Sequence, residues 1–230
     1  MKTQLSEHFH DELTCPYFSQ RDACFEIVQA HGLTGLELDY FLHNGWRKFG
    51  TVFFRPSCVA CNDCLPLRIE VKKFLPTNDQ KRNKKKNMDI EVKVLPLQYF
   101  DEAFELYEKF ERIRFDHDVD KQSFISMFYL SSCPGLQVGY YLSGKLVALG
   151  FLDQGNNSLS SVYFIYDPDY LKRGLGVFGV LREIELASHL ELEFYYLGYY
   201  IKSHHKMCYK GRFGPHQLLN WQSKEWQDNL

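Results

Sequence analysis

A short segment near the end of the chain mixes positive charges with aromatic rings, which a plain core strand does not need. Residues 206–213 hold three cations and two aromatic residues in eight positions, shortly after an aromatic run at residues 195–201. Lysine and arginine beside aromatic rings can hold an anion next to an apolar group. The pattern therefore predicts an anion-binding site with Lys206, Lys210 and Arg212 as its cations. The alternative is that the rings only pack and the cations are solvated.

A cluster of cysteines in the first third of the chain is a second candidate site. Cys58, Cys61 and Cys64 form a C-x2-C-x2-C pattern. Thiolates at this spacing can converge on one zinc ion or on an iron–sulfur cluster. A fourth ligand would have to come from Cys15 or Cys24. The alternative is a set of buried cysteines that act as small apolar groups.

One dense run of positive charge, QKRNKKK at residues 80–86, could bind RNA phosphates. Its cations are Lys81, Arg82, Lys84, Lys85 and Lys86. The whole chain has a net charge of −2 and a pI near 6.5, so a nucleic acid cannot be held by global charge and needs a local basic patch. The alternative interpretation of this run is a solvated linker.

The elements that must position these residues change in character near residue 90. Residues 1–75 carry five of the seven cysteines, a short helix from Gly35 that ends at Asn44-Gly45, and strands near residues 51–55 and 67–71. We expect a small Cys-rich N-terminal domain over residues 1–75. Residues 76–89 are polar and basic and are expected to form a linker.

From residue 90 onward the pattern is regular. It predicts a strand at 90–95, helices at 97–114 and 124–130, strands at 136–142, 146–152 and 159–166, a helix at 176–190 and a strand at 194–201. This order is that of a GNAT-type acyltransferase. The predicted fold class is therefore α+β, with a mostly antiparallel sheet flanked by helices over residues 90–230.

The turn after the third of these hairpin strands is the expected donor-binding turn. It runs from Asp167 to Gly176 and contains Lys172, Arg173, Gly174 and Gly176. Free backbone N–H groups at a helix N-terminus bind anions, and glycine lets a phosphate come close to the backbone. The turn is therefore predicted to bind the phosphates of a donor molecule.

Composition excludes several classes of protein. The N-terminus, MKTQLSEHFHDEL, has no apolar core of a signal peptide, and no run of about 18 apolar residues could span a membrane. Seven cysteines, three of them close together, do not form a disulfide framework, so we expect a reducing, cytoplasmic compartment. A phosphate-binding Walker loop and a G-x-S-x-G elbow are both missing from the sequence.

Several motifs, in the same order, resemble the arginyl-tRNA–protein transferase family. They are Cys15-Pro16-Tyr17, Arg55-Pro56-Ser57 with the cysteine triplet and Arg68, the basic run with Asn87-x-Asp89, Tyr163-x-x-Tyr166-Asp167-Pro168, and Tyr196-x-Gly198-Tyr199-x-Ile201 with Lys206-Met207-x-Tyr209-Lys210-x-Arg212-Phe213. The resemblance implies transfer of an amino acid from charged tRNA to a protein N-terminus. The short chain favours the bacterial branch, the aspartate/glutamate leucyltransferases, with Leu-tRNA as donor and proteins beginning with Asp or Glu as acceptors.

The resemblance also implies roles for individual residues. Lys206, Lys210 and Arg212 would hold the acidic side chain of the acceptor, with Arg55 and Arg68 as alternates. Tyr196, Tyr199 and Tyr209 would orient the amine or the ester carbonyl. Cys15 becomes the favoured fourth ligand of a zinc or iron–sulfur site. No cofactor is required for the chemistry, because the donor is already an activated ester.

Other functions remain open at this point. An arginyltransferase would use the same acceptors. A GNAT acetyltransferase that uses acetyl-CoA would need the donor turn but neither the basic run nor the cysteine triplet. A third alternative is a non-catalytic RNA-binding or zinc module. The sequence does not identify the group that takes the proton from the acceptor amine.

Overall fold

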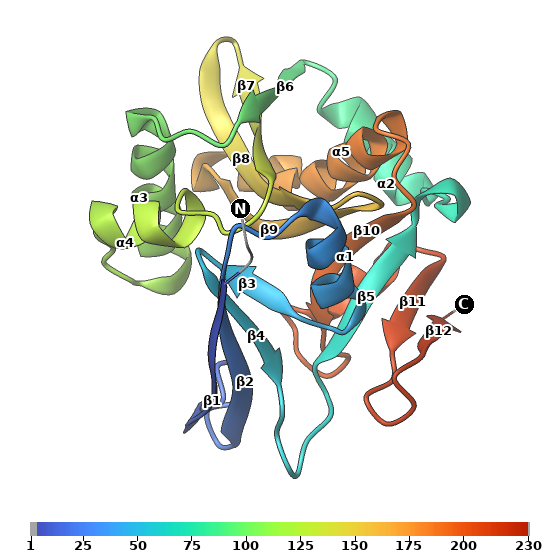
Figure 1. The fold of residues 1–230 in the computed structure, drawn as a ribbon. Helices are drawn as coiled ribbons and strands as arrows, with labels where there is room; N and C mark the ends of the chain where they lie inside the picture. Colours follow the sequence, from blue (N-terminus) through green and yellow to red (C-terminus); the bar gives the residue numbers. More distant parts are fainter. Residues whose placement is uncertain (1–3, 230) are drawn as a thin grey trace.

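The computed structural model describes residues 4–229, with side chains from residue 13 onward, and its strands form two sheets (Figure 1). The smaller sheet holds β1 (Gln4–Thr14), β2 (Asp22–His31), β3 (Arg47–Phe49) and β4 (Val52–Pro56), in the order β1-β2-β4-β3. Every pair in it is antiparallel. The sequence pattern predicts neither β1 nor β2. Residues 1–3 and 230 of the two expected domains lie outside the described residues.

The larger sheet has eight strands in the order β12-β11-β5-β10-β9-β8-β7-β6. Along the chain they are β5 (Leu65–Glu70), β6 (Ile90–Pro96), β7 (Gly135–Leu142), β8 (Lys145–Gln154), β9 (Ser158–Tyr166), β10 (Phe194–Tyr200), β11 (His216–Leu219) and β12 (Trp226–Asn229). Neighbouring strands are antiparallel except β9 and β10, which are parallel.

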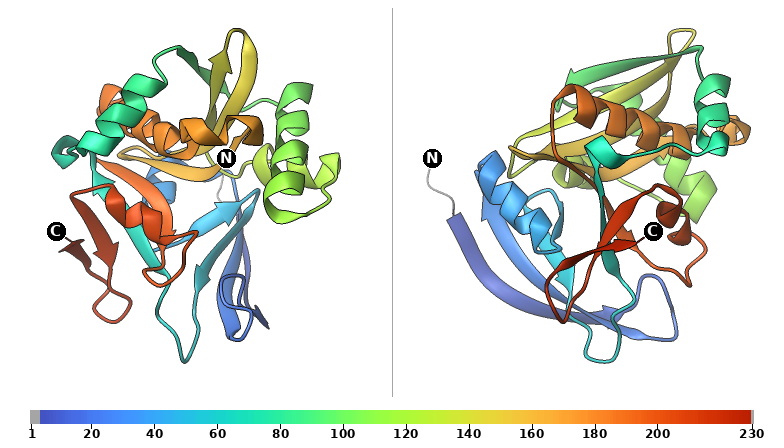
Figure 2. Two further views of the ribbon diagram at one scale, coloured as in Figure 1. Left: turned by 180° about the vertical axis from the view of Figure 1, so that it is seen from behind. Right: turned by 90° about the vertical axis from the view of Figure 1, so that its right-hand side faces the viewer.

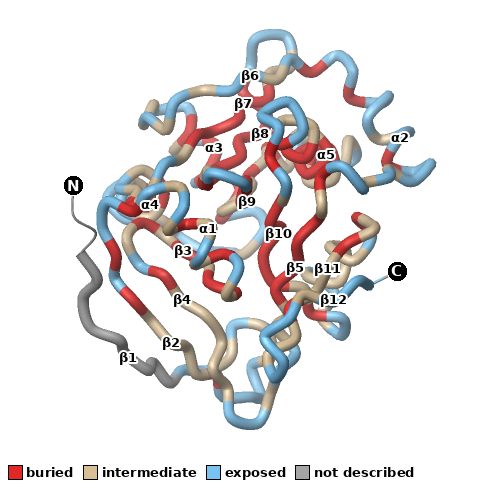
Figure 3. Tube along the Cα trace, turned by 45° about the vertical axis from the view of Figure 1, so that its right-hand side comes forward, coloured by how far each residue is buried: buried red, intermediate tan, exposed pale blue. Residues whose placement is uncertain are grey.

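Helices cover both faces of the larger sheet. Helices α3 (Asp101–Phe115) and α4 (Lys121–Phe128) pack on one face, and α5 (Leu175–His189) packs on the other. Because both faces are covered, β8 is buried from Leu146 to Asp153 (Figure 3). The predicted α+β fold, a mostly antiparallel sheet flanked by helices, is confirmed. Within residues 4–229, every helix is too short or too polar to traverse a lipid bilayer.

The order of elements expected from residue 90 onward is present. After β6 come α3, α4, the three antiparallel strands β7, β8 and β9, the 3-10 helix η2 (Pro168–Arg173), α5 and β10. Residues 76–89, expected to be a linker, instead contain helix α2 (Asn78–Lys86). Its N-terminus has a capping box, in which the Thr77 hydroxyl accepts from the Gln80 N–H and the Gln80 side chain accepts from the Thr77 N–H.

The helix predicted from Gly35 is α1 (Gly35–His43), which ends at Asn44-Gly45 as expected. Thr34 and Glu37 form a capping box at its start. Gly45 has φ of +80°, a left-handed conformation that glycine adopts without strain, and the chain then reverses into β3. This reversal carries Arg47 toward the larger sheet.

The two sheets do not follow the expected division at residue 75. Strand β5 lies inside the larger sheet, between β10 and β11, although it belongs to the Cys-rich part of the sequence. Helix α1 joins the sheets as well, because the Asp39 carboxylate accepts a hydrogen bond of 2.9 Å from the Asn157 N–H in the β8–β9 turn. The backbone of both sheets is shown from behind and from the side in Figure 2. The division into two folding units therefore stays a prediction.

Candidate active site

The predicted donor turn and the basic run lie against each other, although more than 80 residues separate them in sequence. Asn83 Nδ2 of α2 donates to the carbonyl oxygens of Arg173 (3.0 Å) and Gly174 (3.1 Å). Asn87 Nδ2 donates to the Arg173 carbonyl as well, at 3.1 Å. The amide side chains of α2 face inward at helical spacing, so its cations are left on the outer face.

The turn itself is held in shape by charge pairs and a glycine. Arg173 makes a bidentate ion pair with Asp89, with both N–O distances at 2.8 Å. Gly174 has φ of +66°, and a Cβ there would meet Asn83 Nδ2 at 2.7 Å, so both the backbone and the α2 contact require glycine. A Cβ on Gly176 would meet open space. The first turn of α5 is therefore open on the side where a phosphate would approach.

The predicted tRNA- and donor-binding residues thus form one surface. It consists of the five exposed cations of α2 and the turn residues Lys172, Arg173, Gly174 and Gly176. Lys86 Nζ donates to the Lys172 carbonyl at 2.5 Å, which ties the end of α2 to the turn. We call this surface the donor face.

Close to the centre of the larger sheet, β9 and β10 separate. They pair only from Ser158–Phe194 to Ser160–Tyr196, after which β10 pairs with β5 alone. We call the point of separation the fork. Ser160 and Ser161 flank it on β9, and Gly198 flanks it on β10 with φ of +90°. Beyond this point, the backbone groups of β9 and β10 that face each other across the fork are not paired in the sheet.

Two cations reach the fork from different parts of the chain. Arg47 of β3 donates from Nη1 to Ser160 Oγ at 2.7 Å and from Nη2 to the Ser161 carbonyl. Lys210 of the 3-10 helix η3 (Cys208–Arg212) donates from Nζ to the Tyr199 carbonyl at 2.9 Å. A Cβ on Gly198 would lie 3.2 Å from Lys210 Nζ and 3.7 Å from Arg47 Cζ. The two positive groups therefore share the space that a side chain at Gly198 would fill.

Arg47 and Lys210 are not paired with carboxylates in the part of the chain that the structure describes. Among the described side chains neither makes an ion pair, and Asp153, which is near Arg47, is paired with Lys48 at 2.9 Å. Burial, and then the Arg47 charge, lower the pKa of Lys210 to about 7. Burial also lowers the pKa of Arg47. Both residues are intermediate in exposure, and their charged groups are enclosed by the protein.

The structure separates the other predicted acceptor-binding cations from this pair. The ammonium of Lys206 lies over the Phe115 ring, 4.6 Å from its centroid, and Arg212 is exposed. Arg55 pairs with Glu26 at 2.6 Å. The buried Arg68 is stacked between Phe194 and Trp226, at 3.9 and 4.3 Å from the ring centroids. Of the five, only Lys210 lies at the fork.

The three predicted catalytic tyrosines also have different surroundings. Tyr199 donates to the Gly45 carbonyl at 2.9 Å, and the Tyr196 hydroxyl lies 3.5 Å from Arg68 Nη1, so both hydroxyls have partners within the protein. Tyr209 is half-buried in η3, where burial raises its pKa to about 12. Of the three hydroxyls, only that of Tyr209 has no hydrogen-bond partner among the described residues. The catalytic roles given to these tyrosines stay predictions.

Sequence reasoning missed Arg47. It is a single arginine in a strand of three residues, and no repeat, cluster or spacing marks it. Its position depends on the turn at Gly45 and on the pairing of β3 with β4. The side chain of the neighbouring Lys48 lies on the opposite side of the strand and forms a buried ion pair with Asp153, which anchors β3.

The four predicted metal ligands line one narrow pocket of about 20 Å³, together with Tyr17 and Trp221. These ligands are Cys15, Cys58, Cys61 and Cys64. Burial, and then the neighbouring thiols, raise the pKa of Cys64 to about 12. Four thiols are a suitable donor set for zinc or an iron–sulfur cluster. As placed in the structure, no group of three His, Cys, Asp or Glu side chains in the described residues could hold a metal ion.

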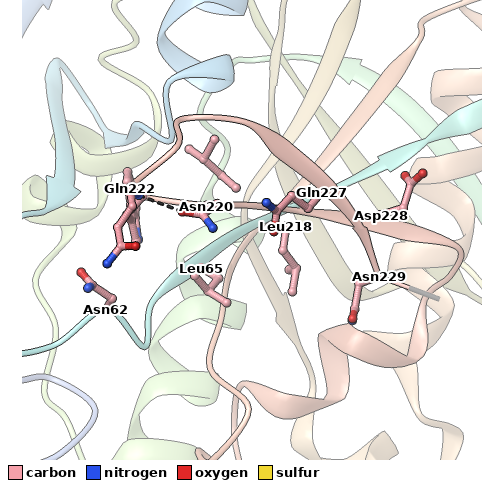
Figure 4. Close-up of a pocket in the computed structure, with 10 residues that line it drawn as sticks. Asn62, Leu65, Leu218, Asn220, Gln222, Gln227, Asp228 and Asn229 are labelled. Atoms are coloured by element: carbon pink, nitrogen blue, oxygen red, sulfur yellow. Dashed lines mark hydrogen bonds between the residues drawn. The ribbon is translucent and has the colours of Figure 1, made fainter.

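A larger pocket of about 310 Å³ lies at the β11–β12 hairpin (Figure 4). Side-chain amides dominate its lining, and Asp228 is its one charged group. None of the residues predicted to bind donor or acceptor lines this pocket. It has no cation with which to hold a phosphate or a carboxylate, so the fork and the donor face remain the better candidates.

Comparison with known proteins gives the same family as the motifs. Residues 13–82 match "Arginine-tRNA-protein transferase, N terminus", and residues 102–220 match "Arginine-tRNA-protein transferase, C terminus". A Shewanella putrefaciens protein named aspartate/glutamate leucyltransferase is 31% identical over 229 residues, 98% of this chain and 97% of its own length. A Thiobacillus denitrificans protein of the same name is 36% identical over 221 residues, 92% of this chain and 91% of its own.

Two solved structures among the matches are distant in sequence from the chain. The structure of L-PGS from Bacillus licheniformis aligns with a TM-score of 0.43 and 8% identity, over 60% of this chain and 47% of that one. A GCN5-related glucosamine N-acetyltransferase region in a fungal β-N-acetylglucosaminidase aligns with a TM-score of 0.44 and 11% identity, over 84% of this chain and 22% of that one.

The fold and the order of its elements define an acyltransferase-like protein with a basic surface at the donor turn. The two family matches and the relatives, which cover nearly the whole chain, make the assignment more specific. The chain belongs to the arginine-tRNA–protein transferase family, whose members are aminoacyltransferases.

Proposed function

We propose that this protein transfers leucine from Leu-tRNA to the N-terminal amine of proteins that begin with Asp or Glu. The observation that carries the proposal is the pair of basic side chains at the fork, Arg47 and Lys210, which have no carboxylate partner among the described residues. A pair of enclosed positive charges without a counter-ion is complementary to one carboxylate. The names of the relatives support leucine as the transferred residue and acidic residues as acceptors.

The chemistry asks mainly for positioning. The donor is an ester on the tRNA 3′ ribose, so its carbonyl is already activated. The nucleophile is an α-amine whose reference pKa is about 7.7–8.0, so a substantial neutral fraction exists near neutral pH. The protein must bring the two together and stabilise the negative charge that develops on the carbonyl oxygen.

Each substrate has a candidate place. The donor face would hold the tRNA backbone through the cations of α2 and the turn at Gly174. Arg47 and Lys210 would hold the acidic side chain of the acceptor at the fork. Arg47 is itself fixed by Ser160 and Ser161 of β9, so the acceptor would be held in a defined orientation to the strand.

The four clustered cysteines come from the β1–β2 and β4–β5 connections, line one pocket, and have the donor atoms that zinc or an iron–sulfur cluster takes. No step of the transfer depends on that site. None of the seven cysteines is in a disulfide, which supports a reducing cytoplasmic compartment.

The test is a transfer assay with the purified full-length protein and peptides that differ only at the first residue. Radiolabelled leucine should move from Leu-tRNA to peptides that begin with Asp or Glu, and peptides that begin with Asn or Gln should stay unlabelled. Parallel reactions with Arg-tRNA and with labelled acetyl-CoA separate the two competing functions. Equal labelling of acidic and amide peptides, or transfer from acetyl-CoA alone, would contradict the proposal.

A further inference from the structure

A buried carboxylate lies beside the fork and has no role in the function described so far. Glu183 of α5 is 1% exposed and projects onto the larger sheet. Its Oε2 accepts a hydrogen bond of 2.6 Å from the hydroxyl of Tyr195 on β10. Its Oε1 is buried and has no hydrogen-bond partner. A buried oxygen without a donor costs free energy, so its retention calls for an explanation.

Two neighbouring residues, Gly150 and Ser161, lie close to this carboxylate. A Cβ on Gly150 of β8 would meet Glu183 Oε1 at 2.6 Å, so glycine at that position makes room for it. The hydroxyl of Ser161 is near both Glu183 and Tyr195. The carbonyl of the same Ser161 accepts from Arg47 Nη2. One residue of β9 therefore connects the carboxylate to the cation that we place at the acceptor side chain.

The surroundings set the proton affinity of Glu183 near neutral pH. Burial raises its pKa to about 7, and Tyr195, Ser161 and the Arg47 charge oppose that rise only in part. The titratable and charged groups facing it are Tyr195 from β10, Arg47 from β3, Tyr140 from β7 and Tyr209 from η3. A base is most effective when its pKa lies near the working pH.

We propose that Glu183, held by Tyr195, is the proton acceptor for the amine that attacks the ester. This inference rests on the proposed function. The amine nitrogen forms a bond to the ester carbon, and the carbon–oxygen bond to the ribose breaks. Because Glu183 is buried, the proton lost by the nitrogen passes to it through the Ser161 hydroxyl, and returns by the same route to the ribose oxygen that leaves. Atoms and charge balance without any other reactant.

A second buried glutamate–tyrosine pair provides a matched control. Glu111 of α3 is 6% exposed and accepts a hydrogen bond of 2.6 Å from Tyr163 of β9, on the opposite face of the same sheet. Its other neighbour is His117, 3.8 Å away. Nothing connects Glu111 to Arg47 or to the fork in the hydrogen bonds described. Glu111→Gln therefore removes a buried carboxylate of the same kind at a site away from the fork.

The experiment compares wild type, Glu183→Gln and Glu111→Gln as full-length proteins in single-turnover transfer from Leu-tRNA to an Asp-peptide. We expect Glu183→Gln to lower the rate ~10²- to 10⁴-fold while the Kd for Leu-tRNA and for the peptide changes less than about threefold. Glu111→Gln should keep the wild-type rate within about threefold. Thermal unfolding at pH 8 should show Glu183→Gln at least as stable as wild type, because the variant removes a disfavoured buried charge.

The pH dependence distinguishes proton transfer from a purely structural role. Wild type needs both a neutral amine and an ionised Glu183, so the slope of log rate against pH should approach about two well below pH 7. In Glu183→Gln only the amine titrates, and the slope should fall to about one. A wild-type rate and slope in Glu183→Gln would overturn the inference. So would a loss of rate fully accounted for by weaker Leu-tRNA binding. Failure of wild type to transfer leucine at all would instead refute the proposed function.

Discussion

The donor face and the fork are both positively charged, but they differ in how their charges are compensated. The cations of α2 are exposed, and several have partners, as in the Arg82–Asp79 pair at 3.2 Å and the Lys84–Glu185 pair. Arg47 and Lys210 are half-buried and rest only on carbonyl and hydroxyl oxygens. Exposed charges act additively and are screened by salt, whereas enclosed charges are specific and need an anion. The donor face is therefore suited to a polyanion, and the fork to a single carboxylate.

The largest expected effect comes from removing both cations at the fork. Arg47→Met with Lys210→Met should lower kcat/KM for an Asp-peptide by ~10²- to 10⁴-fold, since each charge-assisted contact contributes about 1.5–3 kcal/mol. The Kd for Leu-tRNA should stay within about threefold of wild type. Steady-state kinetics and a filter-binding assay give the two quantities.

The exposed cations Lys206 and Arg212 are the control for that comparison. Lys206→Ala and Arg212→Ala should each lower acceptor kcat/KM far less than Lys210→Ala, because neither lies at the fork. A loss as large as that of Lys210→Ala would favour the assignment made from the sequence and would weaken the distinction drawn between the two regions.

Neutralising the donor face should weaken Leu-tRNA binding strongly at low salt, and the difference from wild type should shrink as the salt concentration rises. Changing the five cations of α2 to glutamine should weaken Leu-tRNA binding ~10- to 100-fold at about 0.1 M salt and flatten the dependence of log Kd on log salt concentration. The acceptor KM should hardly change. Lys121→Gln with Lys224→Gln, two exposed cations on other elements, should leave the salt slope as in wild type.

Acceptor binding should take up a proton at Lys210. At pH 8 most of the Lys210 amines are neutral because its pKa is about 7, and a bound carboxylate restores the charge by raising that pKa. A peptide with an N-terminal succinyl group in place of Asp, which has no amine to titrate, should bind with uptake of close to one proton. Calorimetry in buffers of different ionisation enthalpy measures it. Affinity for this peptide should fall as pH rises above 7, and Lys210→Met should remove the proton uptake.

The smallest expected effect on transfer concerns the cysteines. If the thiols of the cluster bind a metal, Cys61→Ser should lower the melting temperature of the protein, since metal binding is coupled to folding. Elemental analysis of protein purified with and without oxygen should find zinc or iron. Cys208→Ser, outside the cluster, should match wild type. Neither metal in either preparation, with Cys61→Ser as stable as wild type, would leave packing as the role of these thiols.

Much of the larger sheet could be predicted because its signals are local. The turns at Ser143-Gly144 and Asn156-Asn157, the helix pattern of α5 and the apolar runs of β7 to β9 are all signals that span only a few residues. The strands β1 and β2 were not predicted although they pair with each other as a hairpin, because the strand preference of a residue depends strongly on its tertiary surroundings. The basic run was expected to be a linker, but inward-facing Gln80, Asn83 and Asn87 form its helix contacts, and amides leave no hydrophobic periodicity to detect.

The sequence by itself determined the family, the order of elements from residue 90, the donor turn, the basic run and the cluster of cysteines. Each is a property of neighbouring residues. Only the tertiary structure brought Arg47 to Ser160, 113 positions away, and Glu183 to Tyr195 beside the fork. The Arg47 contact exists because β3 is directed at the point where β9 and β10 separate, and the Glu183 contact exists because α5 packs on the sheet beside β10. A single buried arginine or glutamate has no pattern of its own, since its chemistry comes from the partners that folding supplies.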